Sequence, residues 1–300
     1  MSARRPRTGS VAIIGAGRAG LALGAALRRA GVSVVGVVAR RASSRSKARR
    51  LLKLTKRPTT FEGAIAPARI VLICVPDDAI ADAARELARH PLRGKIVLHV
   101  SGARGVGPLS RLRRHGARVG TLHPLYSFPP AGTPPASLAD VTFAVDGDRP
   151  AAASARALVR ALGGRALSVP GSRRAAYHLA ASIVSNDLTA LLDLGFALAS
   201  RRLGITRRAA ARALLPLARV SVENIARYGP QRGLTGPAAR GDARTLSAHI
   251  RALAKESALL EEVHRLLSVH AVSMSHEAGR LDARTARSLR RLLSDRKLSH

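Results

Sequence analysis

The chain has 300 residues, 46% of them hydrophobic, and a mean hydropathy of +0.04, which excludes a disordered tail or linker and allows one large domain or two ordinary ones with cores of their own. Its 51 Lys and Arg residues against 18 Asp and Glu give a net charge of +33, a value typical of proteins that bind nucleic acid. The basic residues are nearly all Arg and are scattered over the whole chain, and only 2% of residues are aromatic, so the sequence predicts no dedicated nucleic-acid reader.

The N-terminal segment has the layout of a secretory signal, with basic residues before an apolar run. Arg18 ends that run soon after Val11, however, and glycines interrupt it. No other stretch reaches the roughly 18 uncharged apolar residues that a membrane span needs. We therefore expect a cytoplasmic protein without a membrane span.

The first half of the chain alternates short β-branched runs with helical stretches rich in Ala, Arg and Leu. Apolar strands separated by helices predict βαβ units around a mostly parallel sheet that is buried on both faces. The expected strands are 11–14, 32–38, 70–75, 96–100, 119–122, 141–145 and 166–169.

The first expected strand runs into Gly15-Ala16-Gly17-Arg18-Ala19-Gly20, and a helical stretch and a second strand follow. This spacing in this context is typical of a Rossmann dinucleotide site. Gly15 permits a tight turn, Gly17 lets backbone approach a pyrophosphate, and Gly20 lets the helix pack close to the strand. The N–H groups at the helix N-terminus would face the phosphates. We therefore predict that these six residues bind a dinucleotide; the alternative is a degenerate Rossmann-like domain that binds none.

The end of the second strand indicates which nicotinamide cofactor would bind. An Asp or Glu there would hydrogen-bond the ribose 2′-hydroxyl of NAD, but the strand ends in Ala39-Arg40-Arg41-Ala42-Ser43, and the first acidic residue of the chain is Glu62. Guanidinium and hydroxyl groups suit a 2′-phosphate instead. The sequence therefore favours NADP over NAD, with Arg40, Arg41 and Ser43 as contacts.

The third strand contains the single cysteine, Cys74, and ends in Val75-Pro76-Asp77-Asp78. One cysteine cannot form an intramolecular disulfide, and inside an apolar strand it is expected to be a small buried side chain. Ligands of doubly wound sheets bind beyond the carboxyl ends of strands, so we expect Val75 and Pro76 beside the ribose or nicotinamide. Asp77 or Asp78 is expected to cap the next helix.

Polar residues at the ends of the fourth and fifth strands are the first candidates for substrate chemistry. Parallel strands would bring Ser101 and His123 to the edge that carries the glycine turn. Hydride transfer to a C–O or C–N bond needs a proton donor or acceptor, and histidine titrates near neutral pH. Pro124 restrains His123 to an extended conformation. The alternative for His123 is a turn histidine bonded to backbone, and His99 is expected to be a core residue.

A change of pattern after Gly171 predicts the domain boundary, because hardly any strand candidate follows. We expect residues 1–171 to form the dinucleotide-binding domain and residues 172–300 an all-helical substrate and dimerisation domain. His178 and two serines lie on one face of the first long helix, with Asn186 beside them. A polar stripe on an apolar helix is unfavourable to bury without partners, so it is expected to face a cleft, and His178 and Asn186 are candidate catalytic residues.

Three further patterns in the chain bear on binding. The Gly- and Pro-rich segment 233–242 either binds a polar or anionic substrate group or only connects helices. An apolar stripe near the C-terminus indicates core or a dimer contact, with the members Leu259, Leu260, Val263, Leu266, Leu267 and His270. The ten histidines show no metal-ligand spacing, so no catalytic metal is predicted.

Six segments together resemble a known family. They are the glycine turn, Val75-Pro76-Asp77-Asp78, His99-Val-Ser101-Gly102, Leu122-His123-Pro124-Leu125-Tyr126-Ser127-Phe128-Pro129, Tyr177-His178 to Asn186, and Thr235-Gly236-Pro237 to Asp242. They cover almost the whole chain and resemble bacterial two-domain proteins in which a Rossmann-like domain precedes the domain of unknown function 2520. The resemblance implies membership of the wider group of pyrroline-carboxylate reductase and of hydroxyisobutyrate, phosphogluconate and prephenate dehydrogenases.

The resemblance also implies roles for individual residues. In that group the helical domain commonly dimerises and closes over the nicotinamide. Prephenate dehydrogenases use a Ser after the fourth strand and a His before Pro after the fifth, which is similar to Ser101 and His123 here. The Lys that hydroxyacid dehydrogenases carry on the first interdomain helix is absent, so His178 or Asn186 would have to substitute.

The leading hypothesis is an NADP-dependent oxidoreductase that acts on a small, anionic substrate in the cleft between two domains of a homodimer. The abundance of Arg favours a carboxylate or phosphate on that substrate. A second hypothesis is a non-catalytic NADP(H)-binding or regulatory protein with a Rossmann fold. A third is a nucleic-acid-binding protein driven by charge, which predicts steep salt dependence and no cofactor affinity.

Overall fold

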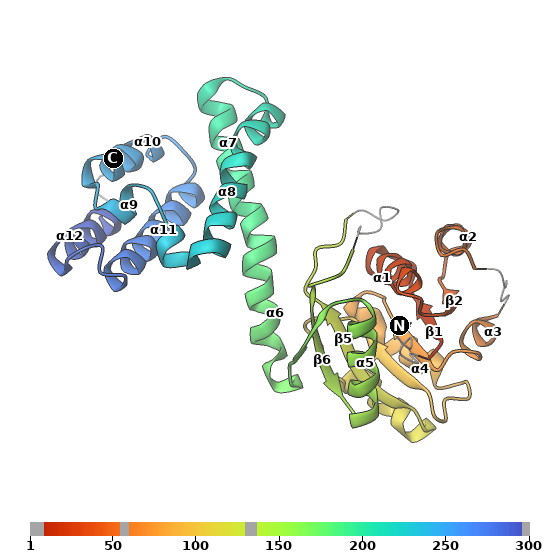
Figure 1. Cartoon of the computed structure of the whole chain (residues 1–300). Helices are drawn as coiled ribbons and strands as arrows, with labels where there is room; N and C mark the ends of the chain where they lie inside the picture. The colour runs from red at the N-terminus through yellow and green to blue at the C-terminus, as the bar shows by residue number, and fades with distance from the viewer. Residues whose placement is uncertain (1–8, 55–59, 130–136, 296–300) are drawn as a thin grey trace, which may run out of the picture. The chain divides into compact units, whose positions relative to one another are not determined.

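The computed structural model describes residues 9–54, 60–129 and 137–295, and the chain divides into two compact units at Asp187 and Leu188. The first unit contains a seven-stranded sheet, and the described part of the second is helical (Figure 1). The predicted fold class, an α/β Rossmann sheet followed by an all-helical region, is confirmed.

The sheet is doubly wound, because the chain starts at an inner strand and builds outward in both directions. The strand order is β2-β1-β3-β4-β5-β6-β7. Strands β1 to β5 run parallel to one another, β6 is antiparallel to β5, and β7 is parallel to β6. Their bounds are β1 Val11–Ile14, β2 Val34–Val38, β3 Ile70–Ile73, β4 Ile96–His99, β5 Arg118–Pro124, β6 Thr142–Gly147 and β7 Arg165–Ser168. All seven expected strands are present, the first with the predicted bounds and the other six with ends shifted by one or two residues.

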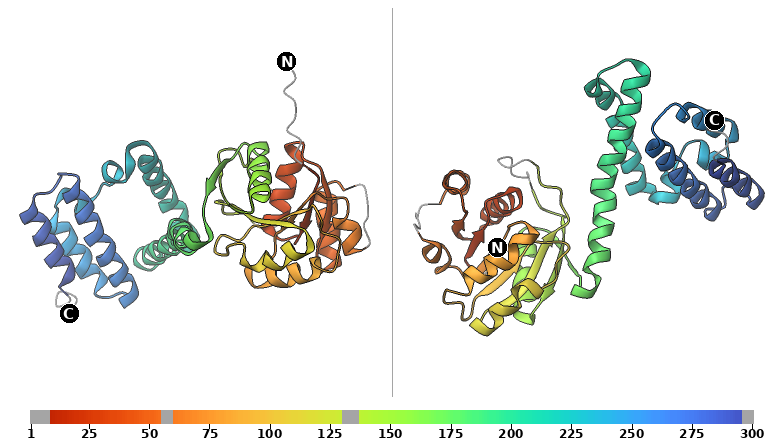
Figure 2. Two further views of the ribbon diagram at one scale, coloured as in Figure 1. Left: turned by 90° about the horizontal axis from the view of Figure 1, so that it is seen from below. Right: turned by 180° about the vertical axis from the view of Figure 1, so that it is seen from behind.

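Helices cover both faces of the sheet, as Figure 2 shows. Residues of β1 alternate between two cores, Val11 and Ile13 on one face and Ala12 and Ile14 on the other. This alternation explains why the central strands are uniformly apolar. One face packs against α1 (Arg18–Arg29), the end of α2 (Ala42–Leu51) and α5 (Arg149–Ala161). The other packs against α3 (Phe61–Ile65), η2 (Gly107–His115) and α4 (Ile80–Leu87), which η1 (Asp77–Ala79) directly precedes.

After β7 the chain turns through η3 (Gly171–Arg173) into a long helical segment. This segment consists of α6 (Arg174–Ser182), the π-helical turn η4 (Ile183–Asp187) and α7 (Leu188–Leu203). The segment Gly171–Leu203 is long and apolar enough, by length and composition, to cross a membrane, and none of its apolar window is buried. Asp187 and Asp193 interrupt this segment, so it contains no uncharged apolar run as long as a membrane span needs.

The second unit adds α8 (Arg207–Gly233), α9 (Pro237–Arg240), α10 (Ala243–Leu253), α11 (Ala258–Glu277) and α12 (Ala283–Ser294) to α7. Side-chain oxygens cap four of these helices, so the sequence marks their starts: Thr206 for α8, Asp242 for α10, Ser257 for α11 and Asp282 for α12. A core that includes Leu246, Ile250 and Val272 holds α10 to α12 together. The segment 233–242 connects α8 to α10 through α9.

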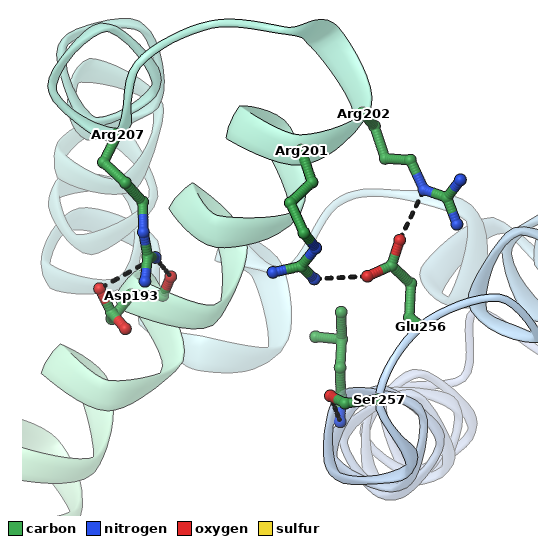
Figure 3. A network of polar contacts seen from close by, with 7 residues as sticks. Asp193, Arg201, Arg202, Arg207, Glu256 and Ser257 are labelled. Carbon is green, nitrogen blue, oxygen red and sulfur yellow. Dashed lines mark hydrogen bonds and ion pairs between the residues drawn. The ribbon is translucent and has the colours of Figure 1, made fainter.

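Ion pairs join α7 to the start of α11 within this unit (Figure 3). Glu256 accepts from both Arg201 and Arg202, and only 4% of its side chain is exposed. Arg207, at the start of α8, donates to the carbonyl and carboxylate oxygens of Asp193 in α7. Because Glu256 directly precedes the cap Ser257, its two ion pairs hold the α10–α11 connection against the end of α7.

Most of the apolar stripe near the C-terminus lies outside the core. Leu259, Leu266 and Leu267 are exposed by 61%, 64% and 47%. The buried face of α11 is one step round the helix and is partly polar, with Leu260, Arg265, Ser268, Val272 and Ser275. The core interpretation is therefore wrong for most of the stripe, because an apolar helix face can also lie on the surface of the protein.

Candidate active site

The turn after β1 has the geometry that the glycine spacing predicts. Gly15 has a φ of +106°, and a Cβ there would collide with the carbonyl oxygen of Cys74. A Cβ on Gly20 would collide with the carbonyl oxygen of Gly15, so both positions are closed to side chains. A Cβ on Gly17 would meet nothing within 4 Å, and no side chain caps the N-terminus of α1. The turn therefore presents open backbone and the first turn of α1, which fits a pyrophosphate.

The end of β2 presents basic groups and no carboxylate. Arg40 and Arg41 are exposed, and Ser43 lies in the first turn of α2, where no acidic side chain occurs. Arg45 donates to the carbonyl oxygens of Ala39 and Arg40 and so closes the end of the strand. These residues fit a nucleotide 2′-phosphate better than a bare ribose hydroxyl.

Residues after β3 and β4 form a hydrogen-bonded pair of loops. The Ser101 hydroxyl donates to Asp77 Oδ2 at 2.7 Å and accepts from the Arg104 backbone N–H at 3.0 Å. Asp77 caps no helix, so the capping interpretation is wrong: its carboxylate is used to bind Ser101 from the neighbouring loop. Val75 and Pro76 follow the end of β3, where Val75 is half-buried and Pro76 is exposed.

His99 is a core histidine, as expected. It is fully buried, its Nε2 lies 2.9 Å from the Gly105 carbonyl oxygen, and its Nδ1 accepts from the Ser101 backbone N–H at 3.2 Å. Burial lowers the pKa of His99, which keeps the ring neutral. Its function in the fold is to fix the 101–105 loop.

His123 lies near the end of β5 and pairs with Tyr177 of α6. The Nδ1 atom of His123 is 2.7 Å from the Tyr177 hydroxyl oxygen, and the two rings meet edge to face. Gly102 packs against this pair from the β4 side, because a Cβ there would lie 2.7 Å from His123 Nε2 and 2.7 Å from His178 Cδ2. The structure thus brings His123, Tyr177, His178 and the loop that begins at Ser101 together at the end of the sheet.

The environment shifts the titration of both members of this pair. Burial, with further contributions from the charges of Arg174 and His178, lowers the pKa of His123 to about 4. Burial raises the pKa of Tyr177 to about 12, and the charge of Arg174 acts in the opposite direction. At neutral pH the pair is therefore a neutral imidazole and a neutral phenol, which hold one mobile proton between them and can pass it on.

The other predicted residue of the long helix lies apart from this group. Asn186 is exposed in η4, where its amide donates to Ser182 Oγ at 3.2 Å. It lies nine residues beyond Tyr177, or roughly 13 Å along the helix. In the described part of the chain, no group of three or more His, Cys, Asp or Glu side chains is placed to hold a metal ion.

Sequence reasoning missed Tyr177 and Arg174. Tyr177 precedes His178 in a segment that the family resemblance already singled out, so its position was visible but its role was not. Arg174 is one of 51 basic residues, and nothing in the sequence separates the one with 1% exposure from the others. Only the three-dimensional structure identifies it.

Comparisons with known proteins support this fold. No curated protein sequence matches the chain. Similar solved structures include a Bacteroides fragilis protein provisionally named an NADP oxidoreductase (21% identity, 88% of this chain and 98% of that chain, TM-score 0.70). They also include a Streptomyces aurantiacus imine reductase (20% identity, 93% of this chain and 99% of that chain, TM-score 0.59). A third is an Aspergillus terreus reductive aminase in complex with NADPH and ethyl-5-oxohexanoate (19% identity, 95% of this chain and 92% of that chain, TM-score 0.56). At these identities the likeness establishes the fold.

The family comparison covers both halves of the chain. Residues 1–124 match the Rossmann-like domain, and residues 141–271 match the domain of unknown function 2520. The predicted resemblance is confirmed. The chain thus consists of a Rossmann-like domain followed by the domain of unknown function 2520.

Proposed function

We propose that this protein is an NADP-dependent oxidoreductase that reduces a C=O or C=N bond of a small substrate, or oxidises the corresponding alcohol or amine. The observation that carries the proposal is the shared position of two features. The open glycine turn follows β1, and the His123–Tyr177 pair lies at the end of β5. Both features are therefore at the carboxyl ends of parallel strands of one sheet. The NADP oxidoreductase, imine reductase and reductive aminase named above share this fold.

The proposed contacts to the cofactor follow the strand ends. Gly15, Ala16, Gly17, Arg18, Ala19 and Gly20 hold the pyrophosphate; Arg40, Arg41 and Ser43 hold the 2′-phosphate; and Val75 and Pro76 flank the nicotinamide side. NADPH, when bound, supplies the hydride. The remaining chemistry is a proton transfer to the substrate heteroatom, which the His123–Tyr177 pair performs, while Ser101 and Asp77 fix the loop that carries Gly102.

The anionic character of the substrate is part of the proposal. Arg104 lies two residues after Gly102, on the loop that contacts His123 and His178, and its side chain is exposed. A carboxylate on the substrate would find a bidentate donor there. His178 and Asn186 are proposed to complete substrate binding, with residues 172–300 as the substrate and dimerisation domain.

We further propose a cytoplasmic homodimer formed through the helical region. Leu179, Val184 and Leu217 are exposed by 59%, 71% and 65%, which is unfavourable for a free surface. A second copy is the favoured occupant rather than a bilayer, because each of Asp187 and Asp193 would cost about 3 kcal/mol at the centre of a membrane. Cys74, buried and with a pKa raised by burial to about 12, is an unreactive thiol that suits a reducing compartment.

Turnover is tested by following NADPH oxidation against a panel of small cyclic imines and keto acids. The wild-type chain is expected to turn over at least one member, and Tyr177→Phe, which retains the ring but loses the hydroxyl, is expected to lose about 100-fold or more in kcat. Tyr228→Phe, at an exposed tyrosine of α8, is the matched control and should leave turnover unchanged. Saturable NADPH binding with no turnover of any panel member would instead favour a non-catalytic NADP(H)-binding protein.

A further inference from the structure

Arg174 is a buried cation that faces neutral acceptors. Its exposure is 1%, and its guanidinium donates to the carbonyl oxygens of Val169 and Ser101, each at 3.3 Å, and to the Thr121 hydroxyl. No carboxylate of the described residues lies within ion-pair distance of it. Buried charges are normally paired, because desolvation is costly, so an unpaired buried guanidinium requires an explanation.

The groups that feel this charge belong to the candidate site. The Arg174 Cζ atom lies 5.8 Å from the centroid of the Tyr177 ring. Its field also reaches His123 and His99, where it opposes protonation. The charge of Asp146 on β6 favours the charged form of Arg174, while the charges of Asp77 on η1 and His178 on α6 act on His123. Of these groups, only Tyr177 would gain from Arg174 by becoming an anion.

We propose that Arg174 is a positioning residue whose fixed positive charge makes Tyr177 the proton donor of the site and keeps His123 a neutral relay behind it. This inference rests on the proposed oxidoreductase function. A protonated imidazole beside the buried guanidinium would put two cations at one strand end, whereas a phenolate there forms an ion pair with Arg174. The charge of Arg174 therefore disfavours protonated His123 as the proton donor and favours Tyr177.

The proton that the substrate takes up comes from solvent water, through the His123–Tyr177 pair. As hydride adds to the substrate carbon, the π electrons of the C=O or C=N bond move to the heteroatom. The heteroatom takes the Tyr177 hydroxyl proton, so the phenolic O–H bond breaks and an O–H or N–H bond forms. The phenolate then takes the proton from His123 Nδ1 while a water molecule donates a proton to Nε2, so the imidazole changes tautomer and stays neutral. A proton from solvent neutralises the hydroxide that forms. Arg174 stabilises the phenolate during this sequence and loses no proton itself, because its guanidinium stays charged.

The test measures the ionisation of Tyr177 directly. The chain has three tyrosines, so Tyr126→Phe with Tyr228→Phe leaves Tyr177 as the single phenol. Incorporation of 3-fluorotyrosine brings its titration nearer to neutral pH, where ¹⁹F NMR can follow it in the full chain. Arg174→Met is expected to raise the Tyr177 midpoint by about one pKa unit, and Arg174→Lys, which keeps the charge, should leave it within a few tenths of a unit.

A second variant gives a shift of the opposite sign and does not alter the buried arginine. Asp146→Asn removes the carboxylate that offsets Arg174, so the Tyr177 midpoint is expected to fall. This variant keeps the inference testable if Arg174→Met does not fold. A midpoint unchanged in Arg174→Met, or unchanged in Asp146→Asn, would overturn the inference. NADPH titration of the same proteins separates the two claims: unaltered binding with an unmoved midpoint refutes only the role of Arg174, whereas absent binding in the wild-type chain refutes the oxidoreductase proposal itself.

Discussion

Gly17 and Gly20 lie three residues apart in one turn, yet their surroundings differ completely. The space beside Gly17 is open, whereas Gly20 lies against the Gly15 carbonyl oxygen. Gly17→Ala should therefore keep the unfolding free energy within about 1 kcal/mol, because its φ of −79° suits any residue. Gly20→Ala should lower it by about 2 kcal/mol or more, because helix and strand must separate. Urea unfolding of the two variants checks the contrast, and equal losses would contradict the account.

The depressed pKa of His123 also predicts a pH dependence of stability. In the unfolded chain its pKa returns to 6.5, against about 4 in the fold. Between these pH values the unfolded chain binds more protons at His123 than the folded chain does. The free energy of unfolding therefore has its full value above pH 6.5 and decreases as the pH falls toward 4. The full change is roughly 3 kcal/mol. His123→Asn, which cannot titrate but can hydrogen-bond Tyr177, should show a shallower decline in urea unfolding across this window; parallel curves would show that the wild-type imidazole is not held neutral.

Only some of the residues in the proposed catalytic site could be predicted from the sequence. Ser101 and His123 were predicted from their places after parallel strands, and the structure puts both at one end of the sheet. Tyr177 joins His123 across 54 positions in the chain, and no local pattern encodes such a contact. The buried position of Arg174 depends on its hydrogen bonds to Thr121 of β5 and to the Ser101 carbonyl after β4, which composition alone does not specify.

Secondary-structure elements were predicted well where apolar periodicity is unambiguous. The strands of the central sheet are uniformly apolar because both faces are covered, and turns with Gly or Pro separate them from the helices. The exposed side of α11 was not predictable, because an apolar helical stripe looks the same whether it faces a core or an outside surface. The π-helical turn Ile183–Asp187 likewise leaves no mark in the sequence pattern, although it shifts every later side chain round the helix.

The helical unit offers a test at the same scale. Glu256 is nearly buried between Arg201 and Arg202, whereas Asp193 and its partner Arg207 are both more than half exposed. Glu256→Gln should lower the urea midpoint of the unit and speed amide exchange in the α10–α11 connection, because it leaves a buried amide beside two unpaired guanidinium groups. Asp193→Asn is the control, with an expected change within about 0.5 kcal/mol. Similar effects of both changes would show that the Glu256 ion pairs do not hold the connection.

At the scale of the whole molecule, the exposed apolar side chains of the long helix predict a dimer. Val184, at 71% exposure, is the most exposed of them. Val184→Lys should shift the chain from dimer to monomer, as measured by light scattering coupled to size-exclusion chromatography over a range of protein concentrations. Arg212→Lys on α8 preserves charge and serves as the control. A wild-type monomer that instead floats with neutral lipid vesicles would assign this face to a membrane.

The net charge of +33 makes nonspecific attraction to any polyanion a competing explanation for cofactor binding. Salt at about 0.3 M screens most of this attraction, while contacts made inside the glycine turn persist. A binding experiment under these conditions therefore separates a built site from a basic surface.

The most direct test is a titration of the purified chain with NADPH and with NADH at about 0.3 M salt. We predict saturable binding of NADPH, at least tenfold weaker binding of NADH, loss of binding in Gly17→Val, and loss of the preference for NADPH when Arg40 and Arg41 are both replaced by Ala. Saturation by neither cofactor, or binding that Gly17→Val leaves unchanged, would contradict the assignment of this protein as an NADP-dependent oxidoreductase.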